Sequence, residues 1–415
     1  MLNAELGVYI HIPFCSSICN YCNFNRGLYD EALKTRYVEA VLREIAHWGR
    51  PEGLRDRSLD DAATVARASR SAQAADPASA EATAGPPKPC AKADTIFFGG
   101  GTPSLLEPDE IASIIQSVRR AFDLAADAEI TLETNPETVD RGKLERFRAA
   151  GVNRLSFGVQ SFHDEELRRL GRIHSADRAR QAVRDARAAG FDNVSADLMM
   201  WLPGQNVAAW LENVDALIDA APDHASLYLL ELYPNAPLKE EMARAGLSLA
   251  PDDAAAEMYL TAMERLEGAG LEQYEISNVA RPAKASRHNL KYWSDGEWLA
   301  FGCGAHSTFG GVRWKNVAAT GEYIERVASG RDLVTERRVL SPQERLEEAL
   351  FTGLRLNEGV DLVAISARYD VDVWSRYGQA LQPFVESGWL VREEARLRLT
   401  REGMLMANEV MAVFV

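Results

Sequence analysis

Short β-rich runs alternate with amphipathic helical patterns over the first three quarters of the chain. Residues 7–12 form an apolar run closed by Pro13, which suits the end of a strand because proline removes a backbone donor. Apolar positions at three- and four-residue spacing then predict a helix over 31–48. The same pairing recurs, with strands expected at 95–98, 129–133, 154–158, 193–199 and 225–230 and helices at 108–122, 140–150, 175–189 and 207–220.

Six strands that alternate with helices predict an α/β fold, a parallel sheet whose outer side is covered by crossover helices. A partial, TIM-like barrel of six β/α units fits this rhythm best, and a doubly wound open sheet is the alternative. In both folds the chemistry gathers in loops at the carboxyl ends of the strands. Candidate residues are therefore sought there.

The rhythm ends near residue 310, which predicts a core domain over 1–310 and a second domain over 311–415. The second domain is expected to be mostly helical and winged-helix-like, with helices near 342–354 and 373–386, a hairpin, and a last helix from Thr400. Within the core, residues 50–93 are rich in Ala, Ser, Arg, Asp and Pro, with almost no large apolar residues. They predict a disordered insertion, in which Cys90 is incidental.

Charge narrows the function classes. The 415 residues include 46 Lys plus Arg against 61 Asp plus Glu, a net charge of −15, which argues against a nucleic-acid surface. The hairpin region 386–402 balances four Arg with four Glu, so the winged-helix resemblance does not add a DNA-binding prediction. No apolar run approaches the ~18 residues of a membrane span, and the first residues lack the pattern of a secretory signal. A cytoplasmic protein is expected.

Three of the five cysteines, Cys15, Cys19 and Cys22, follow the first predicted strand with the spacing C-x3-C-x2-C. A cube of four irons and four sulfides needs four ligands, and thiolates are its usual protein ligands. Three thiolates leave one iron open to the amino and carboxylate groups of S-adenosylmethionine, whose sulfonium one electron would cleave to a deoxyadenosyl radical. Zinc is the alternative, but it needs four ligands and the next histidine is the distant His47.

Five stretches in the order 9–15, 98–104, 133–136, 154–162 and 197–205 carry a family resemblance. The sequence resembles the radical S-adenosylmethionine (radical SAM) superfamily, and within it the oxygen-independent coproporphyrinogen III oxidase-like family with its sister group, the HemW heme chaperones. At Trp201 the family usually has Gly. The resemblance implies a cofactor pocket lined by Tyr9, Gly100, Gly101, Thr102, Glu133, Gln160, Arg172, Asp197 and Glu231.

The residues themselves agree with such a pocket. The glycines at 99–101 lie between a strand and a helix, where backbone N–H groups can approach a carboxylate, although a plain tight turn is the alternative. Glu133 and Asp197 end strands and offer acceptors for ribose hydroxyls or an ammonium group. Helix capping or a salt bridge would be their ordinary role.

Two functions of different classes follow from the resemblance. One is a heme chaperone that binds the cluster, S-adenosylmethionine and heme and delivers heme to client proteins. The other is an oxygen-independent coproporphyrinogen III dehydrogenase, which decarboxylates propionate side chains. The dehydrogenases have the cysteine pattern C-x3-C-x2-C-x-C, and this chain has Phe24 at the position of the fourth cysteine. They also carry an N-terminal extension before the first barrel strand, which is not expected here because that strand begins near Gly7. The chaperone without dehydrogenase activity is expected, and a radical enzyme with another substrate is the third alternative.

The segment 288–293 matches the H-N-x-x-Y-W signature of the chaperone group. A heme site needs an imidazole for iron, aromatic surface for the macrocycle and cations for the propionates. His288 is therefore expected to contact heme iron, with His306 and Cys303 as alternatives, and an ordinary loop pinned by its aromatics as the plain interpretation. The surrounding groups are Arg281, Lys284, Arg287, Lys291, Tyr292 and Trp293.

The remaining histidines carry weaker expectations. His11 lies on the strand that leads into the cluster loop and is expected near it, and the others are assigned to helix surfaces or turns: His47, His163, His174 and His224. The expected partners are heme-accepting proteins and an electron donor. The sequence leaves homodimerisation open.

Overall fold

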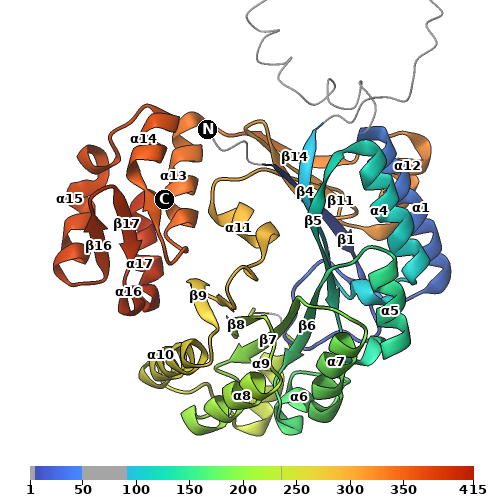
Figure 1. Ribbon diagram of the computed structural model, residues 1–415, viewed down its shortest axis with the longest axis horizontal. Helices are drawn as coiled ribbons and strands as arrows, with labels where there is room; N and C mark the ends of the chain where they lie inside the picture. Colours follow the sequence, from blue (N-terminus) through green and yellow to red (C-terminus); the bar gives the residue numbers. More distant parts are fainter. Residues whose placement is uncertain (1–4, 49–90, 235) are drawn as a thin grey trace, which may run out of the picture.

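The computed structural model describes residues 5–48, 91–234 and 236–415. Its main element is a 12-stranded sheet whose centre holds six parallel strands in chain order (Figure 1). Because neighbours in the sheet are consecutive in the chain, the order never reverses as in a doubly wound sheet, and the predicted partial barrel is confirmed. The six strands are β1 (Leu6–Ile12), β4 (Lys92–Gly100), β5 (Asp123–Thr134), β6 (Arg154–Gln160), β7 (Val194–Met200) and β8 (His224–Leu229).

Crossover helices cover the outer side of this sheet (Figure 1). Along β1, Val8, Ile10 and Ile12 are fully buried in the core beneath these helices, while Tyr9 and His11 point to the inner side. This is the two-residue alternation of a strand. The outer helices are α1 (Glu31–Trp48), α4 (Pro108–Ala121), α5 (Arg141–Ala149), α6 (Asp164–Arg169), α7 (Ala176–Ala188), α8 (Val207–Asp219) and α10 (Asp252–Gly268).

Further strands extend the sheet at both ends. β11 (Trp298–Phe301) runs parallel to β1, and antiparallel strands continue from it; β10 (Asn278–Ala280) and β9 (Glu272–Glu275) lie beyond β8. The continuing strands are β12 (His306–Phe309), β13 (Val312–Asn316) and β14 (Val334–Val339), with α12 (Thr320–Ser329) between the last two. The boundary expected at residue 310 therefore falls inside the sheet, and we propose a boundary near Leu340.

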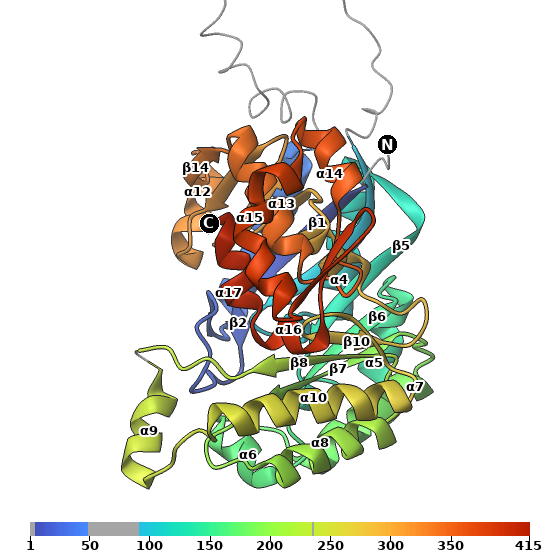
Figure 2. The same cartoon turned by 90° about the vertical axis from the view of Figure 1, so that its left-hand side faces the viewer.

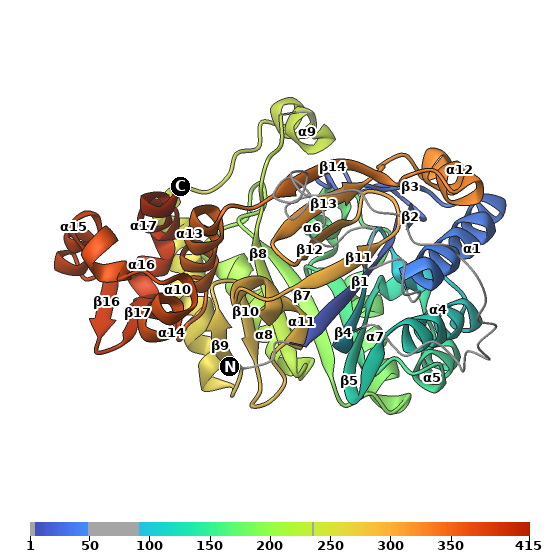
Figure 3. The same cartoon turned by 90° about the horizontal axis from the view of Figure 1, so that it is seen from above.

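The C-terminal domain has the element order of a winged helix: helix, strand, two helices and a two-stranded hairpin. It lies on the side of the barrel away from α1 and α4 (Figure 3). Its elements are α13 (Pro342–Gly353), β15 (Val360–Asp361), α14 (Leu362–Tyr369), α15 (Val373–Glu386), β16 (Leu390–Glu393), β17 (Arg396–Leu399), α16 (Arg401–Leu405), α17 (Ala407–Met411) and η3 (Ala412–Phe414).

Shorter elements complete the chain. Helix α11 (Arg287–Trp293) lies on the inner side of the sheet (Figure 1), and α9 (Pro237–Ala245) stands away from the barrel (Figure 2). The others are β2 (Phe14–Cys15), β3 (Gly27–Leu28), η1 (Pro103–Leu105) and η2 (Pro136–Thr138).

The predicted insertion lies almost wholly outside the described residues. At its end, Lys92 and Ala93 belong to β4, so the insertion does not extend to residue 93. None of the helices in the described segments is long and apolar enough to cross a membrane.

Candidate cofactor site

The cysteine loop closes on itself at the carboxyl end of β1. β2 pairs with β3, so Cys15 lies opposite Leu28 and the loop between them carries the other two thiols. Cys15 is buried, while Cys19 and Cys22 are partly exposed, and all three are free. Arg172 donates to the sulfur of Cys19 at 3.4 Å. A cation beside these sulfurs favours the thiolate form that binds metal.

Burial raises the pKa of the Cys15 and Cys22 thiols, and the neighbouring sulfurs raise it further. Among the described residues, no three His, Cys, Asp or Glu side chains converge on a point that a single metal ion could occupy. A four-iron cube does not require such convergence, because each thiolate binds a different iron. The donor set of three neighbouring sulfurs thus fits a cube better than one zinc ion.

The glycine turn after β4 packs directly against the cysteine loop. Gly100 has φ +113°, and a Cβ there would lie 2.6 Å from the His11 ring; a Cβ on Gly101 would lie 2.7 Å from the carbonyl oxygen of Phe14. Only glycine fits this approach of two backbones. The N–H groups of Gly101 and Thr102 donate to the carbonyls of Ile12 and Phe14, each at 2.7 Å.

The N–H groups predicted to approach a ligand carboxylate are therefore used within the protein. Gly100 likewise donates its N–H to the carboxylate of Glu133, at 3.1 Å. The turn fastens the cysteine loop to β4 and orients Glu133. Thr102 also touches the loop, with its hydroxyl 3.7 Å from the sulfur of Cys15.

Glu133 and Asp197 form a carboxylate pair on the inner side of β5 and β7. Burial and the charge of Asp197 raise the pKa of Glu133 to about 8. Burial also raises the pKa of Asp197, although the hydroxyl of Ser156 donates to it at 3.2 Å. Two carboxylates held in a poorly solvated site favour a cationic ligand, which would restore both to the charged form.

Arg154, which the sequence reasoning missed, lies next to this pair. It is 2% exposed, its Nε has no hydrogen-bond partner among the described residues, and its charge lowers the pKa of both Glu133 and Asp197. The signal in the sequence was an arginine at an inward position of a buried strand, beside Leu155 and Phe157.

Two further predicted pocket residues are Gln160, which ends β6, and Arg172, which contacts the cysteine loop. Gln160 sits at a register shift between β6 and β7 with φ +69°, and its Oε1 has no partner in the described structure. Arg172 donates to the carbonyl of Gly158 at 2.7 Å as well as to Cys19. Strained backbone and an unpaired polar atom at a strand end are typical of ligand sites.

Two predicted pocket residues, Tyr9 and Glu231, make their hydrogen bonds and ring contacts with residues outside the cysteine loop in the described structure. Tyr9 stacks on Phe97 on the inner side, and its hydroxyl lies 3.3 Å from Nδ1 of His11. Glu231 is exposed beyond β8 and accepts a hydrogen bond from Tyr233 at 2.7 Å. Trp201 has φ +63°, so the position where the family usually has glycine keeps the left-handed backbone that favours glycine.

His288 lies at the other end of the barrel interior. It is 1% exposed, with Nδ1 2.8 Å from the hydroxyl of Thr95 and Nε2 2.9 Å from that of Tyr292. Burial lowers the pKa of His288 to about 3. Both ring nitrogens are thus engaged, and neither faces solvent or the cysteine loop.

Strand geometry separates His288 from the cysteine loop. Its hydrogen-bond partner Thr95 lies five positions before Gly100 on β4. At a rise of ~3.3 Å per residue, Thr95 and Gly100 are about 17 Å apart along the strand. The cations expected for propionates are also paired: Lys291 and Arg287 contact Asp94 at 2.6 and 3.1 Å. Lys284 and Arg281 donate to backbone carbonyls. These ion pairs and hydrogen bonds hold the 281–293 segment against the barrel.

The two alternative heme ligands differ in access. Cys303 is fully buried, with its sulfur 3.6 Å from the hydroxyl of Thr320. His306 is exposed on β12. His224, expected on a helix surface or in a turn, is instead buried at the start of β8 and hydrogen-bonds Ser195 at 2.8 Å.

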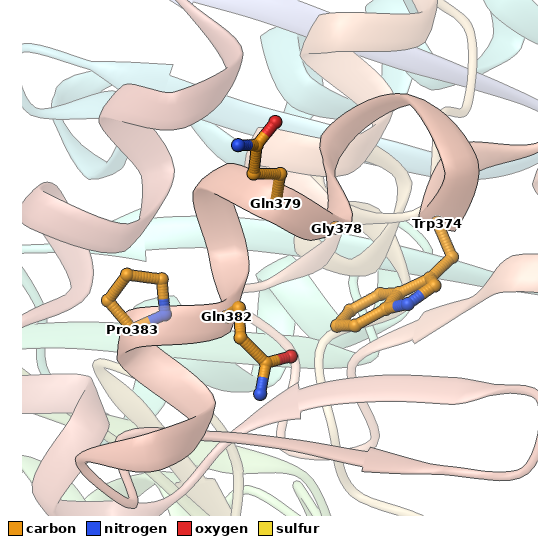
Figure 4. A pocket seen from close by; sticks show the side chains of 5 residues that line it. All are labelled: Trp374, Gly378, Gln379, Gln382 and Pro383. Atoms are coloured by element: carbon orange, nitrogen blue, oxygen red, sulfur yellow. The ribbon is translucent and has the colours of Figure 1, made fainter.

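A hollow of about 410 Å³ on α15 lies away from these groups. Figure 4 shows Trp374 and Gln382 on one side of the helix and Gln379 on another. Its lining residues, which include no acid, base or thiol, are Trp374, Gly378, Gln379, Gln382 and Pro383. This hollow offers no chemistry comparable with the barrel mouth.

A partial parallel barrel with a three-cysteine loop at its carboxyl end defines a radical SAM protein. Residues 76–247 match the family described as the radical SAM superfamily, and residues 340–406 match the HemN C-terminal domain. The chain is similar to the heme chaperone HemW of Bacillus subtilis, 32% identical over 98% of both chains. It therefore belongs to the HemW family within the radical SAM superfamily.

Two further similarities extend this result. A mitochondrial radical S-adenosyl methionine domain-containing protein 1 of Bos taurus is 34% identical over 97% of this chain and 86% of that protein. The solved structure of coproporphyrinogen III oxidase (HemN) from Escherichia coli superposes with a TM-score of 0.80, covering 99% of this chain and 90% of that one at 22% identity. The similarity to coproporphyrinogen III oxidase concerns the fold alone.

Proposed function

We propose that this protein is a heme chaperone that holds a four-iron cluster and S-adenosylmethionine at the barrel mouth, binds heme, and delivers it to client proteins. The observation that carries the proposal is the convergence of the cysteine loop, the glycine turn and the Glu133–Asp197 pair at one end of the strands. Full-length similarity to HemW proteins supports the heme part.

Cys15, Cys19 and Cys22 would hold the cluster, which when bound supplies one electron to a coordinated sulfonium cofactor. The chain's own residues prepare the place for that cofactor. Arg172 contacts the sulfur of Cys19, and the glycine turn fixes Glu133 within reach of the same strand ends. Glu133 and Asp197 would bind the cofactor's ammonium or ribose hydroxyls, with Gln160 and Glu231 closer to the rim.

The coproporphyrinogen dehydrogenase remains the second candidate because the fold is shared with coproporphyrinogen III oxidase. Phe24 favours the chaperone, since it occupies the position of the additional cysteine in the dehydrogenase pattern and is 65% exposed. An exposed aromatic beside the cysteine loop offers apolar contact to a macrocycle. A thiol at that position would not.

The test uses full-length protein reconstituted anaerobically with iron and sulfide. S-adenosylmethionine binding is measured by calorimetry and hemin binding by the Soret band in parallel titrations, and a third sample receives coproporphyrinogen III, reductant and S-adenosylmethionine. We expect both ligands to bind at micromolar concentration and no decarboxylated product. Product formation with multiple turnovers, or failure of hemin to bind, would reject the chaperone.

A further inference from the structure

Strands β11 to β14 continue the inner face of the barrel beyond β1. Cross-strand partners share one face of a sheet, and the pairings Trp298 with Thr308 and Thr308 with Arg313 define one such row. Trp298 faces the inner side, because its ring meets Tyr292 of α11 at 4.7 Å between centroids. The opposite face carries Trp314, which stacks on Trp48 of α1.

His306 belongs to this inner face. It pairs with Lys315 on β13, which pairs with Glu336 on β14. The imidazole of His306 is exposed and has no hydrogen-bond partner among the described residues. Of the seven histidines, four are buried and bonded, namely His11, His174, His224 and His288; His163 faces Glu212, and His47 lies on outer helix α1.

The cysteine loop reaches the same place. The side chain of Asn25 donates to the carbonyls of Cys303 and Ala318 at 3.1 and 3.0 Å. Gly304 leaves room for it, since a Cβ there would lie 2.3 Å from the Asn25 amide. Phe24, which directly precedes Asn25, is 65% exposed, so the cysteine loop carries an accessible apolar ring next in sequence to the residue that contacts this turn.

We propose that heme binds at this junction, with His306 as the axial ligand of iron, Phe24 against the macrocycle and Lys315 paired with a propionate. The inference rests on the proposed heme-binding function and assigns its site. It places heme beside the cysteine loop, with His306 as the iron ligand in place of the signature histidine His288, which is buried inside the barrel.

The electrostatics of this face suit an anionic iron porphyrin. Although the ring is accessible, its partial burial lowers the pKa of His306, and the charges of Lys315 and Arg313 lower it further, while Glu336 raises it. The imidazole is therefore neutral near pH 7, the form that binds iron. Lys315 meets Glu336 at 3.6 Å in an exposed pair of small energetic worth, which a propionate can replace.

The experiment titrates hemin into reconstituted full-length wild type, His306→Ala and His47→Ala, with His288→Ala as the competing variant. Far-UV circular dichroism and iron content confirm that each variant is folded. We expect wild type and His47→Ala to share one Soret band and low-spin signal. His306→Ala should weaken hemin binding at least tenfold or convert the iron to high spin, and Phe24→Ala should weaken binding without changing the spin state.

The outcomes separate the two proposals. If wild type takes up no hemin, the chaperone function fails and the site fails with it. If wild type binds hemin and His306→Ala matches it in affinity and spectrum, only the site is overturned. A folded His288→Ala that alone loses the axial ligand would likewise overturn it, in favour of a barrel that opens at α11.

Discussion

The carboxylate of Glu133 accepts a hydrogen bond from the backbone N–H of Gly100 at 3.1 Å, which joins the end of β5 to the turn after β4. The next two N–H groups of that turn hold the strand that carries Cys15. One short turn therefore positions both the cysteine loop and the carboxylate. We infer that cluster binding at the three thiols and cofactor binding at Glu133 both depend on the geometry of this turn.

Replacing Glu133 with glutamine should weaken S-adenosylmethionine binding. The amide keeps the shape but removes the charge that would face an ammonium group, a loss of about 1.5–3 kcal/mol, or roughly tenfold to a hundredfold in Kd. Calorimetry on reconstituted protein measures it. Glu137→Gln, in the exposed η2 turn, is the matched control and should bind as wild type does. Equal affinity in the Glu133 variant would remove this residue from the cofactor site.

The same affinity should depend on pH. Burial and the charge of Asp197 raise the pKa of Glu133 to about 8, so below pH 8 it must lose a proton before it can pair with a cation. Binding should therefore strengthen as the pH rises from 6.5 to 8.5 and level off above that. The groups that set this pKa are Asp197, Arg154 and the Gly100 N–H. A pH-independent Kd, or one that weakens with rising pH, would contradict the assignment; Glu133→Gln should flatten the profile.

Arg154→Met should move that profile upward. The arginine lowers the pKa of both Glu133 and Asp197, so its removal leaves the pair harder to ionise. We expect weaker binding at pH 7 and partial recovery above pH 9, measured by the same calorimetry. Arg141→Met, on the exposed side of α5, serves as control. An unchanged profile in a folded Arg154 variant would mean that the arginine acts on neither carboxylate.

Gly101→Ala should destabilise the protein and disturb the cysteine loop. Its Cβ would meet the backbone oxygens of Phe14 and Ile12 at 2.7 and 2.9 Å, and neither can move without its strand. The free energy of unfolding should fall by about 2 kcal/mol, seen in urea denaturation, with lower iron incorporation. Gly142→Ala in α5 meets nothing closer than 3.4 Å and should be neutral or stabilising. If Gly101→Ala and Gly142→Ala unfold at the same urea concentration, the close approach of Gly101 to the Phe14 and Ile12 backbone is contradicted.

The periodicity of the sequence predicted the elements of the barrel well. The helix expected over 31–48 is α1, Glu31–Trp48, because its apolar face is continuous. The edge strand β14 escaped notice since Val334–Val339 is almost entirely exposed and polar. Its pairing is set by the neighbouring strand β13 and not by a local hydrophobic pattern.

The candidate site was predictable only where residue chemistry is unusual. Three thiols within eight positions indicate a metal site in any fold. The burial of His288 depends on Thr95, 193 positions away in the chain, and no local pattern encodes that contact. The unpaired Nε of Arg154, which has no hydrogen-bond partner among the described residues, and the accessibility of His306 become visible only once the strands are paired, because register decides which face each side chain occupies.

The central claim is that Cys15, Cys19 and Cys22 bind a four-iron cluster with one open iron. The direct measurement is iron and sulfide analysis with electron paramagnetic resonance of reduced, anaerobically reconstituted protein, with and without S-adenosylmethionine. We predict about four irons and four sulfides per chain, a signal that changes when S-adenosylmethionine is added, and loss of both in Cys19→Ala but not in Cys90→Ala. Zinc as the only bound metal, or a full cluster in the Cys19 variant, would contradict the claim.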